Sequence, residues 1–120
     1  MKGLWLGILL SLLAVPGYPA EWTLLETNPG GMMLYMKPGG CEGSLCRSDV
    51  LIKGKDDDKA DGLFAYPQFD CDKGMYRDSR ASESFKKGTH MIYPTTTDWS
   101  APRDKSAVQK VMQAVCPQKP

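Results

Sequence analysis

The sequence predicts an α+β fold: an antiparallel β-sheet of about four to six strands with one C-terminal helix packed on it, stapled by disulfides. Three observations support this prediction. Short apolar segments separated by turn residues fill the middle of the chain, and helical periodicity appears only near its end. Four cysteines follow an apolar leader, which is typical of exported domains that are cross-linked by disulfides.

The leader has the features of a secretory signal peptide. A basic residue precedes an apolar run from Leu4 to Val15, which is too short to span a bilayer as a helix. We expect cleavage after Ala20 or Gly17, and an uncleaved N-terminal anchor is the alternative. The chain therefore divides into a signal peptide at residues 1–20 and a single domain at residues 21–120.

Export fixes the expected location of the protein. The first cysteine is Cys41, so no lipid-modified cysteine follows the signal, and we expect a periplasmic or secreted protein with no stable membrane anchor after cleavage. Of the 15 basic and 14 acidic side chains, only Lys2 lies in the leader, which leaves the domain with a net charge near zero. Nucleic acid is therefore not expected as a partner, because binding phosphates requires a basic excess.

The domain opens with a predicted β-hairpin. Glu21 to Thr27 and Met32 to Lys37 are short apolar segments that flank the turn signal NPGG. Trp22 and Leu24 share one face of the first strand. The apolar side chains that share one face of the second strand are Met32, Leu34 and Met36. We expect one buried face on this hairpin, which ends at the turn-rich stretch from Pro38 to Ser44.

Further strands are expected in the middle of the chain. Asp49 to Lys53 is a third strand, and the charged segment from Lys53 to Gly62 is a solvated loop. Leu63 to Asp78 is one long bent strand or two shorter ones, with Pro67 at a sheet edge or a bulge. Thr89 to Thr97 is rich in β-branched and aromatic residues and is the last predicted strand.

The end of the chain changes to the helical period. The apolar side chains at positions i, i+3, i+4 and i+7 are Val108, Val111, Met112 and Val115. Ser106 and Gln109 match a capping box, and Pro117 stops the helix. A helix of this length is not stable alone, so its apolar stripe is expected to pack on the sheet. We also expect Trp22 and Trp99 to be largely buried.

Four cysteines allow three pairings, and the sequence alone does not choose among them. Cys41 and Cys46 bracket the short loop EGSL and favour a local bridge. Cys71 lies in a strand segment and Cys116 at the end of the helical stripe, so a bond between them would tie the helix to the sheet. We expect the pairs Cys41–Cys46 and Cys71–Cys116. A four-thiolate zinc site is the alternative, but the spacing and the expected export argue against it, so neither a metal nor a cofactor is expected.

Few residues are suited to catalysis. His90 is the only histidine, and it lies in an alternating strand segment, where a surface or packing role is the usual one. Asp70 and Asp72 flank Cys71 and would share the opposite strand face as solvated residues. Motifs for a serine nucleophile, a zinc protease or a phosphate loop are absent from the sequence. We expect a protein that is not an enzyme.

A cluster of carboxylates lies in the charged loop. Its members are Asp56, Asp57, Asp58 and Asp61. A calcium loop that starts at Asp57 fails at two ligand positions, which Lys59 and Gln68 occupy. We interpret the segment as a solvated loop and treat its four aspartates as a candidate interaction loop.

Short motifs of the second half follow a fixed order. They are Phe69-Asp70-Cys71, Gly88, Trp99, Ser106 and Val115-Cys116. From Phe69 to Cys116 this order resembles the surface-adhesin protein E family of small exported bacterial proteins. In that family an aromatic-Asp-Cys motif lies in a central strand, and a tryptophan precedes a serine at the start of a short helix and a final cysteine. The resemblance implies an antiparallel sheet backed by the helix, a Cys71–Cys116 bond and a non-enzymatic role.

The leading functional hypothesis is a small exported non-enzymatic binding module of the surface-adhesin protein E type. Some members of that family bind host matrix proteins, so the expected partner is another protein, whose identity the sequence does not give. The alternative is a secreted inhibitor of a hydrolase such as lysozyme, which would act through the protruding loop from Lys53 to Gly62.

Overall fold

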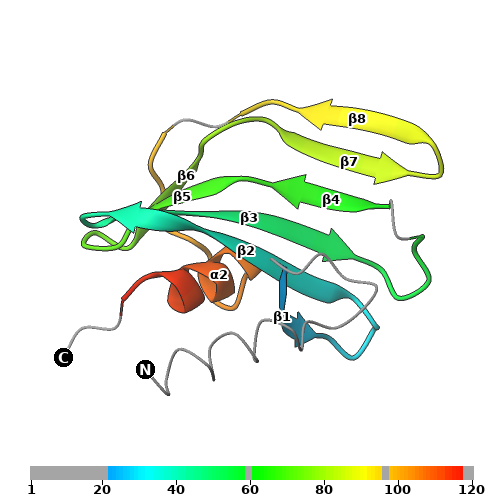
Figure 1. Ribbon diagram of the computed structural model, residues 1–120, viewed down its shortest axis with the longest axis horizontal. Coiled ribbons are helices and arrows are strands. Elements are labelled where there is room, and N and C mark those ends of the chain that lie inside the picture. The colour runs from blue at the N-terminus through cyan, green and yellow to red at the C-terminus, as the bar shows by residue number, and fades with distance from the viewer. Residues whose placement is uncertain (1–21, 59–60, 96–97, 118–120) are drawn as a thin grey trace, which may run out of the picture.

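The computed structural model describes residues 22–58, 61–95 and 98–117, and in them an antiparallel β-sheet carries one helix on one face (Figure 1). The strands are β1 (Thr23–Thr27), β2 (Met33–Glu42), β3 (Leu45–Lys53), β4 (Gly62–Ala65), β5 (Pro67–Asp70), β6 (Met75–Asp78), β7 (Ser82–Lys86) and β8 (Thr89–Tyr93), and the helix is α2 (Ala107–Val115). The predicted fold class is confirmed. The expected signal peptide at residues 1–20 lies outside the described residues.

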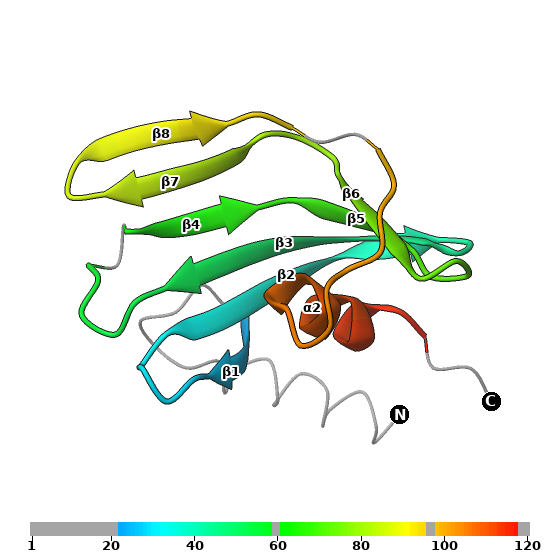
Figure 2. The ribbon, with the colours of Figure 1, turned by 180° about the vertical axis from the view of Figure 1, so that it is seen from behind.

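The sheet is a meander in which two strands are interrupted. Its strand order is β1-β2-β3-β4-β7-β8, and every pair is antiparallel. β5 continues the line of β4 along the edge of β3, and β6 pairs with β5 on its other side. Both views show β4 and β5 as successive parts of one curved path (Figures 1 and 2).

The break between β4 and β5 is hydrogen-bonded to the break between β6 and β7. Tyr66 separates β4 from β5, and its carbonyl oxygen accepts hydrogen bonds from the backbone N–H and the hydroxyl of Ser79, both at 2.8 Å. Ser79 lies in the gap between β6 and β7. One bent strand or two shorter ones were expected from Leu63 to Asp78, and three are observed: β4, β5 and β6. Pro67 begins β5 at a break inside the sheet, because it has no N–H to donate.

β2 and β3 are longer than the sequence indicated. β2 runs through Pro38 to Glu42, and β3 already begins at Leu45. The register shifts between Pro38 and Gly40, where Gly40 adopts a φ of 88°. Glycine accepts this left-handed conformation without steric cost, so the turn-rich stretch forms a bulge in the pairing of β2 with β3, and β2 continues through it.

β7 is a strand that the sequence analysis did not predict. It pairs with β8 through a two-residue turn, in which Lys87 and Gly88 have φ values of 49° and 80°. Positive φ at both positions is the signature of the tight hairpin turns that match the twist of the sheet. The predicted last strand, Thr89 to Thr97, is observed as far as Tyr93, and residues 96–97 lie outside the described part of the chain.

The core lies between α2 and the sheet. Its buried side chains are Leu34, Met36, Val50, Phe69 and Val111, of which Phe69 and Val111 are completely enclosed. The predicted helical stripe is confirmed: Val111 is 0% exposed, and Val108, Met112 and Val115 pack against the same cluster. The Ser106 hydroxyl accepts a hydrogen bond from the N–H of Gln109 at 3.2 Å, as a helix N-cap should.

The opening hairpin buries only some of the side chains predicted for its buried face. Leu34 and Met36 are buried under α2, whereas Leu24 is 49% exposed and Met32, which precedes β2, is 50% exposed. The register shifts between Leu24 and Glu26, so the intervening Leu25 turns toward the core while Leu24 faces away from it.

The segment after β8 returns to the sheet before it enters α2. Ser100 forms an isolated bridge with Tyr76 of β6 through two backbone hydrogen bonds, at 2.9 and 3.0 Å. In the same place the guanidinium of Arg77 stacks on Trp99, 4.5 Å from the ring centroid. Trp99 and Trp22 are partly buried and not fully enclosed, because both lie outside the core beneath α2.

Both expected disulfides are present. Cys41–Cys46 joins residues directly opposite each other on β2 and β3, with Cα atoms 4.0 Å apart. Cys71–Cys116 joins the turn after β5 to the end of α2, with Cα atoms 5.6 Å apart. Cys71 lies just beyond β5 and not within a strand, since Cys71 to Gly74 forms a turn.

Candidate functional site

The register of the strands defines the face of the sheet that α2 does not cover. Residues paired across antiparallel strands point to the same face. One such row crosses the whole sheet and consists of Leu24, Tyr35, Leu51, Phe64, Glu83 and Ile92. The neighbours of Tyr35 along β2, Leu34 and Met36, belong to the core under α2. Because successive residues alternate between faces, the row lies on the opposite side, which we call the open face.

Aromatic side chains form a continuous line on the open face. The rings of Trp22 and Phe64 meet edge to face at 6.2 Å, and Phe64 and Phe85 do so at 5.7 Å. Phe85 stacks on His90 with 4.3 Å between centroids. Lys37 lies over Trp22 at the other end, 5.4 Å from the ring centroid. Aromatic rings that remain partly exposed are typical of protein-binding surfaces.

His90 is held in this line by its neighbours. Its Nε2 lies 3.4 Å from Oε1 of Glu83, a residue of β7 on the same face. The second oxygen of Glu83 accepts a hydrogen bond from the hydroxyl of Tyr66 at 3.3 Å. The stacking on Phe85 and the contact with Glu83 give His90 a packing role at the end of the aromatic line.

β8 carries three exposed apolar side chains in succession. Met91 is 52% exposed, Ile92 64% and Tyr93 42%. β8 ends the strand order, and within the described residues it pairs only with β7. Figures 1 and 2 show it along the outer margin of the sheet. An edge strand with exposed apolar side chains presents backbone N–H and C=O groups to which another strand can pair.

The four aspartates of the candidate interaction loop have different surroundings. Asp57 Oδ2 accepts a hydrogen bond from the Gly54 N–H at 2.7 Å, and Asp61 is only 9% exposed. Asp61 Oδ1 accepts from the N–H of Lys87 at 3.1 Å and so ties the loop to the turn between β7 and β8. Asp56 and Asp58 are exposed.

Asp70 and Asp72 do not form a pair of opposed carboxylates. Oδ1 of Asp70 accepts hydrogen bonds from the N–H groups of Asp72 and Lys73, at 3.1 and 3.2 Å. This is a turn-stabilising role, which aspartate commonly fills. The interpretation of Asp72 as a strand residue was wrong, because the chain turns directly after β5.

Among the hollows of the described surface are two small ones. One, of about 200 Å³, is lined by residues of the β2–β3 end, among them Gly40, Leu45 and Arg47. The other, of about 230 Å³, lies between β1, β2 and α2 and includes Glu26 and Lys110. Both are smaller than the roughly 300–1,000 Å³ of ordinary small-molecule pockets. In the described part of the chain, every buried side-chain nitrogen and oxygen has a hydrogen-bond partner.

Comparisons with protein-family models, with curated proteins and with solved structures find no match to this chain. Among the described residues, α2 is too short to cross a bilayer, and no other helix there has the length and apolar character to do so.

The sequence predicted β8 but not the exposed side chains of the open face. The segment from Thr89 to Tyr93 was predicted as a strand, yet nothing in the prediction placed its side chains outside the core. The prediction treats the segment as alternating, but Met91, Ile92 and Tyr93 are three apolar residues in succession. Such a run is typical of a strand buried on both faces, so the pattern gave no sign of exposure. The aromatic line could not be found, because it joins residues from four separate segments.

Proposed function

We propose that this protein is an exported, non-enzymatic binding module that takes an extended segment of another protein along the edge of β8. The observation that carries the proposal is the exposure of Met91, Ile92 and Tyr93 together on the outermost strand of the sheet. The resemblance to the surface-adhesin protein E family supports the same class of function, and the two disulfides are compatible with an oxidising compartment.

The geometry of β8 favours an added strand as the mode of binding. A peptide that pairs with an exposed edge gains affinity from backbone hydrogen bonds and specificity from alternate side chains. Ile92 lies on the open face in the same row as Phe64 and Glu83, whereas Met91 pairs with Ser84 on the other face. A strand bound along β8 would therefore contact apolar side chains on both faces of the sheet.

A non-enzymatic role is supported by the surroundings of the groups that could move a proton. His90 is stacked on Phe85 and lines neither of the two hollows described above. Asp70 is occupied by two backbone N–H groups. All four cysteines are bonded in disulfides and offer no nucleophile.

Site-specific photo-crosslinking tests the proposal. A photoreactive amino acid at position 92 of the exported protein should yield a crosslinked product with a partner from periplasmic or extracellular protein. The same amino acid at position 32 is the matched control. Met32 is also an exposed apolar residue, 50% exposed against 64% for Ile92, but it lies before β2 and not on β8. The crosslinked partner is then purified, and its affinity for the native domain is measured directly.

Substitutions at the same two positions supply the second arm. Ile92→Lys should weaken binding of that partner at least tenfold, because a charge on the contact face must be desolvated. Met32→Lys should leave the affinity unchanged, and both variants should unfold at the denaturant concentration of the wild type. Equal loss in both variants, or crosslinking only from position 32, would overturn the assignment to β8.

A hydrolase inhibitor is the second candidate function, and one observation favours it. The Asp57 side chain closes the turn at Gly54, so the exposed Asp56 and Asp58 are presented on a braced loop. Such a loop suits a cationic target. If this function is right, the double substitution Asp56→Asn and Asp58→Asn should abolish inhibition of a cationic hydrolase such as lysozyme, while Ile92→Lys should not affect it.

A further inference from the structure

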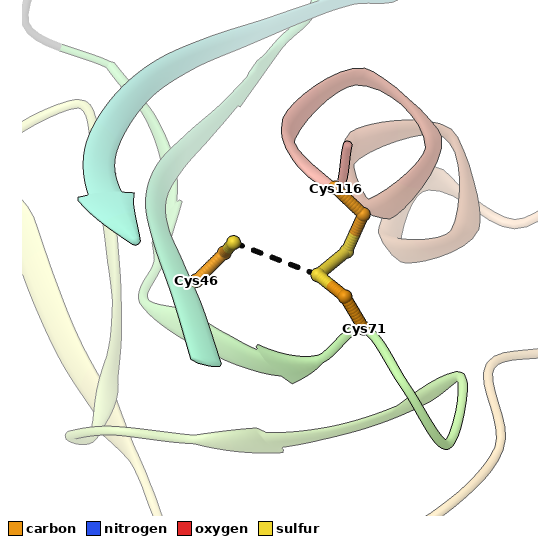
Figure 3. Close-up of side chains that lie close together, drawn as sticks. All are labelled: Cys46, Cys71 and Cys116. Atoms are coloured by element: carbon orange, nitrogen blue, oxygen red, sulfur yellow. Dashed lines mark hydrogen bonds between the residues drawn. A yellow bond between two sulfur atoms is a disulfide. The ribbon is translucent and has the colours of Figure 1, made fainter. Parts of the chain in front are cut away.

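Three of the four cysteines have their sulfurs in one cluster, although the four are bonded as two separate disulfides. Cys46 Sγ is 3.5 Å from Cys71 Sγ, and the sulfurs of Cys46, Cys71 and Cys116 all lie within 4.8 Å of one another (Figure 3). Neither sulfur of the 3.5 Å contact carries a proton, since both are in disulfides. Cys41 Sγ is bonded to Cys46 and lies 3.9 Å from the carbonyl oxygen of Val115.

The arrangement of the three sulfurs is a triangle and not a line. In thiol–disulfide exchange the attacking sulfur approaches along the axis of the bond that breaks. For Cys46 to attack Cys71 in this way, its distance to Cys116 would have to equal the 3.5 Å contact plus the 2.02 Å bond, which is beyond the observed limit of 4.8 Å. The cluster is therefore poorly arranged for exchange between its two bonds.

A triangle of sulfurs fits one face of a tetrahedral metal site. With a zinc–sulfur bond of about 2.3 Å, thiolates around a tetrahedral Zn²⁺ are separated by about 3.8 Å. The unbonded separations, 3.5 Å between Cys46 and Cys71 and at most 4.8 Å between Cys46 and Cys116, are compatible with this value. Cys71 and Cys116, bonded at 2.02 Å, must move apart to it when their disulfide is reduced. We propose that the reduced protein binds one Zn²⁺ through the thiolates of Cys46, Cys71 and Cys116, with Cys41 as the fourth ligand.

The backbone holds the four cysteines in place without help from the disulfides. Cys41 and Cys46 are register partners on β2 and β3, and Cys46 also pairs with Phe69 of β5. The N–H of Cys71 donates to the carbonyl of Ser44 at 2.8 Å, and that of Cys116 donates to the carbonyl of Met112 at 2.9 Å. These hydrogen bonds do not involve the sulfur atoms, so they keep the thiols close together in a reduced chain that stays folded.

The step from disulfides to metal site is balanced by a dithiol reductant. Each protein disulfide takes up two electrons and two protons, and one dithiol is oxidised to its own disulfide in return. The four thiols then release their protons as Zn²⁺ binds the thiolates. Oxidised and metal-bound forms exclude each other, because a sulfur in a disulfide is not a thiolate ligand.

Cobalt is the probe, because tetrahedral Co²⁺ thiolate sites absorb in the visible and Zn²⁺ sites do not. The full mature protein is reduced with a phosphine in the absence of oxygen, and Co²⁺ is added. We expect intense d–d bands that saturate at one Co²⁺ per chain and disappear when Zn²⁺ displaces it. The oxidised protein should show none of these bands.

Single substitutions assign the ligands. Cys46→Ser should abolish the tetrahedral spectrum, because it removes the buried member of the three-sulfur cluster. Cys41→Ser, at an exposed position outside that cluster, should keep the spectrum with water as the fourth ligand and with the thiolate charge-transfer intensity lowered by about one quarter. His90→Ala, which removes the only histidine, should leave the spectrum unchanged. Bands that persist in Cys46→Ser, or that are lost in His90→Ala, would overturn the proposed ligand set.

Circular dichroism covers the case in which reduction unfolds the chain. The reduced protein should then recover its native far-ultraviolet spectrum when Zn²⁺ is added, because the metal binds the folded arrangement of sulfurs. A reduced chain that stays unfolded in Zn²⁺, or a folded reduced chain that gives no cobalt bands, would refute the site.

Discussion

The aspartates between β3 and β4 show how similar side chains in one loop acquire different roles. Asp61 is nearly buried and binds the backbone of Lys87 in another hairpin, and Asp57 closes a local turn. Asp56, one position before Asp57, is exposed. Proximity in sequence therefore says little about whether a carboxylate of this loop supports the fold or faces a partner.

Substitution of two of these aspartates should separate the roles. Asp61→Ala should lower the free energy of unfolding by about 1–2 kcal/mol, since the N–H of Lys87 loses its hydrogen bond to the nearly buried carboxylate. Asp56→Ala should change it by less than about 0.5 kcal/mol, as exposed substitutions usually do. Urea unfolding monitored by tryptophan fluorescence measures both. Equal effects would show that Asp61 is not a structural residue.

At the scale of the element, α2 depends on contacts with the rest of the molecule. It spans only Ala107–Val115, too short for an isolated helix in water. Val111 is enclosed in the core, Lys110 pairs with Glu26 of β1, and Cys116 at its end is bonded to Cys71. The helix is thus fixed at its middle and at its C-terminal end.

The two sides of α2 should respond differently to truncation. Val111→Ala removes methyl groups from a fully buried site and should cost about 2 kcal/mol of stability. Gln113→Ala, on the exposed side, should cost less than about 0.5 kcal/mol. Denaturant midpoints at equal slope compare the two. A cost for Gln113→Ala that matched that for Val111→Ala would contradict the observed packing.

The N-terminus of α2 offers a further test. Ser106→Ala removes the hydroxyl that accepts the Gln109 N–H, and N-cap losses of this kind cost about 1 kcal/mol. Ser106→Asp should restore the cap and recover the stability of the wild type. Failure of aspartate to recover it would indicate that the Ser106 hydroxyl acts through its other contact, the 2.6 Å hydrogen bond to the carbonyl of Arg103.

At the scale of the whole molecule, the two disulfides close loops of very different length. Cys71 and Cys116 are 45 residues apart in sequence, and Cys41 and Cys46 are 5 apart. The long bridge also joins the helix to the sheet, whereas the short one links strands that are already paired along their length. Most of the covalent stabilisation therefore belongs to Cys71–Cys116.

Paired substitutions quantify the difference. On the chain-entropy model, the double change Cys71→Ser and Cys116→Ser should cost about 4 kcal/mol, and Cys41→Ser with Cys46→Ser about 2 kcal/mol. Peptide mapping without reduction should find no free thiol in the wild type. A peptide that links Cys41 or Cys46 to either of the other two would contradict the pairing, and a larger loss from the short bridge would contradict the ranking.

The sequence contained enough information for the fold class, the two bridges and the helix. The period of Val108, Val111 and Val115 is local, and the helix therefore appears where the pattern places it. β7 was missed because its apolar content is a single phenylalanine, Phe85, whose neighbours on the open face come from β4 and β8. Strands whose exposed face carries the aromatic residues give no alternating signal of burial.

The candidate site was less predictable than the fold. The prediction placed interaction at the aspartates, because charge in a loop is visible in sequence. Exposure of Ile92 depends on β8 being the last strand of the order, and the sulfur cluster depends on three separate elements meeting at one place. Both are properties of the tertiary arrangement, which a single sequence does not encode in any local pattern.

The meander order bears on how the chain acquires its structure. Once the interrupted strands are counted as one, each strand lies beside the strand that precedes or follows it in the chain. Such nearest-neighbour pairing keeps the loop-closure entropy of each step low and favours rapid formation of the sheet. α2, by contrast, must wait for β2 and β3, on which it packs. During oxidative refolding, thiol trapping should therefore capture a one-disulfide species with Cys41–Cys46 closed before Cys71–Cys116 forms.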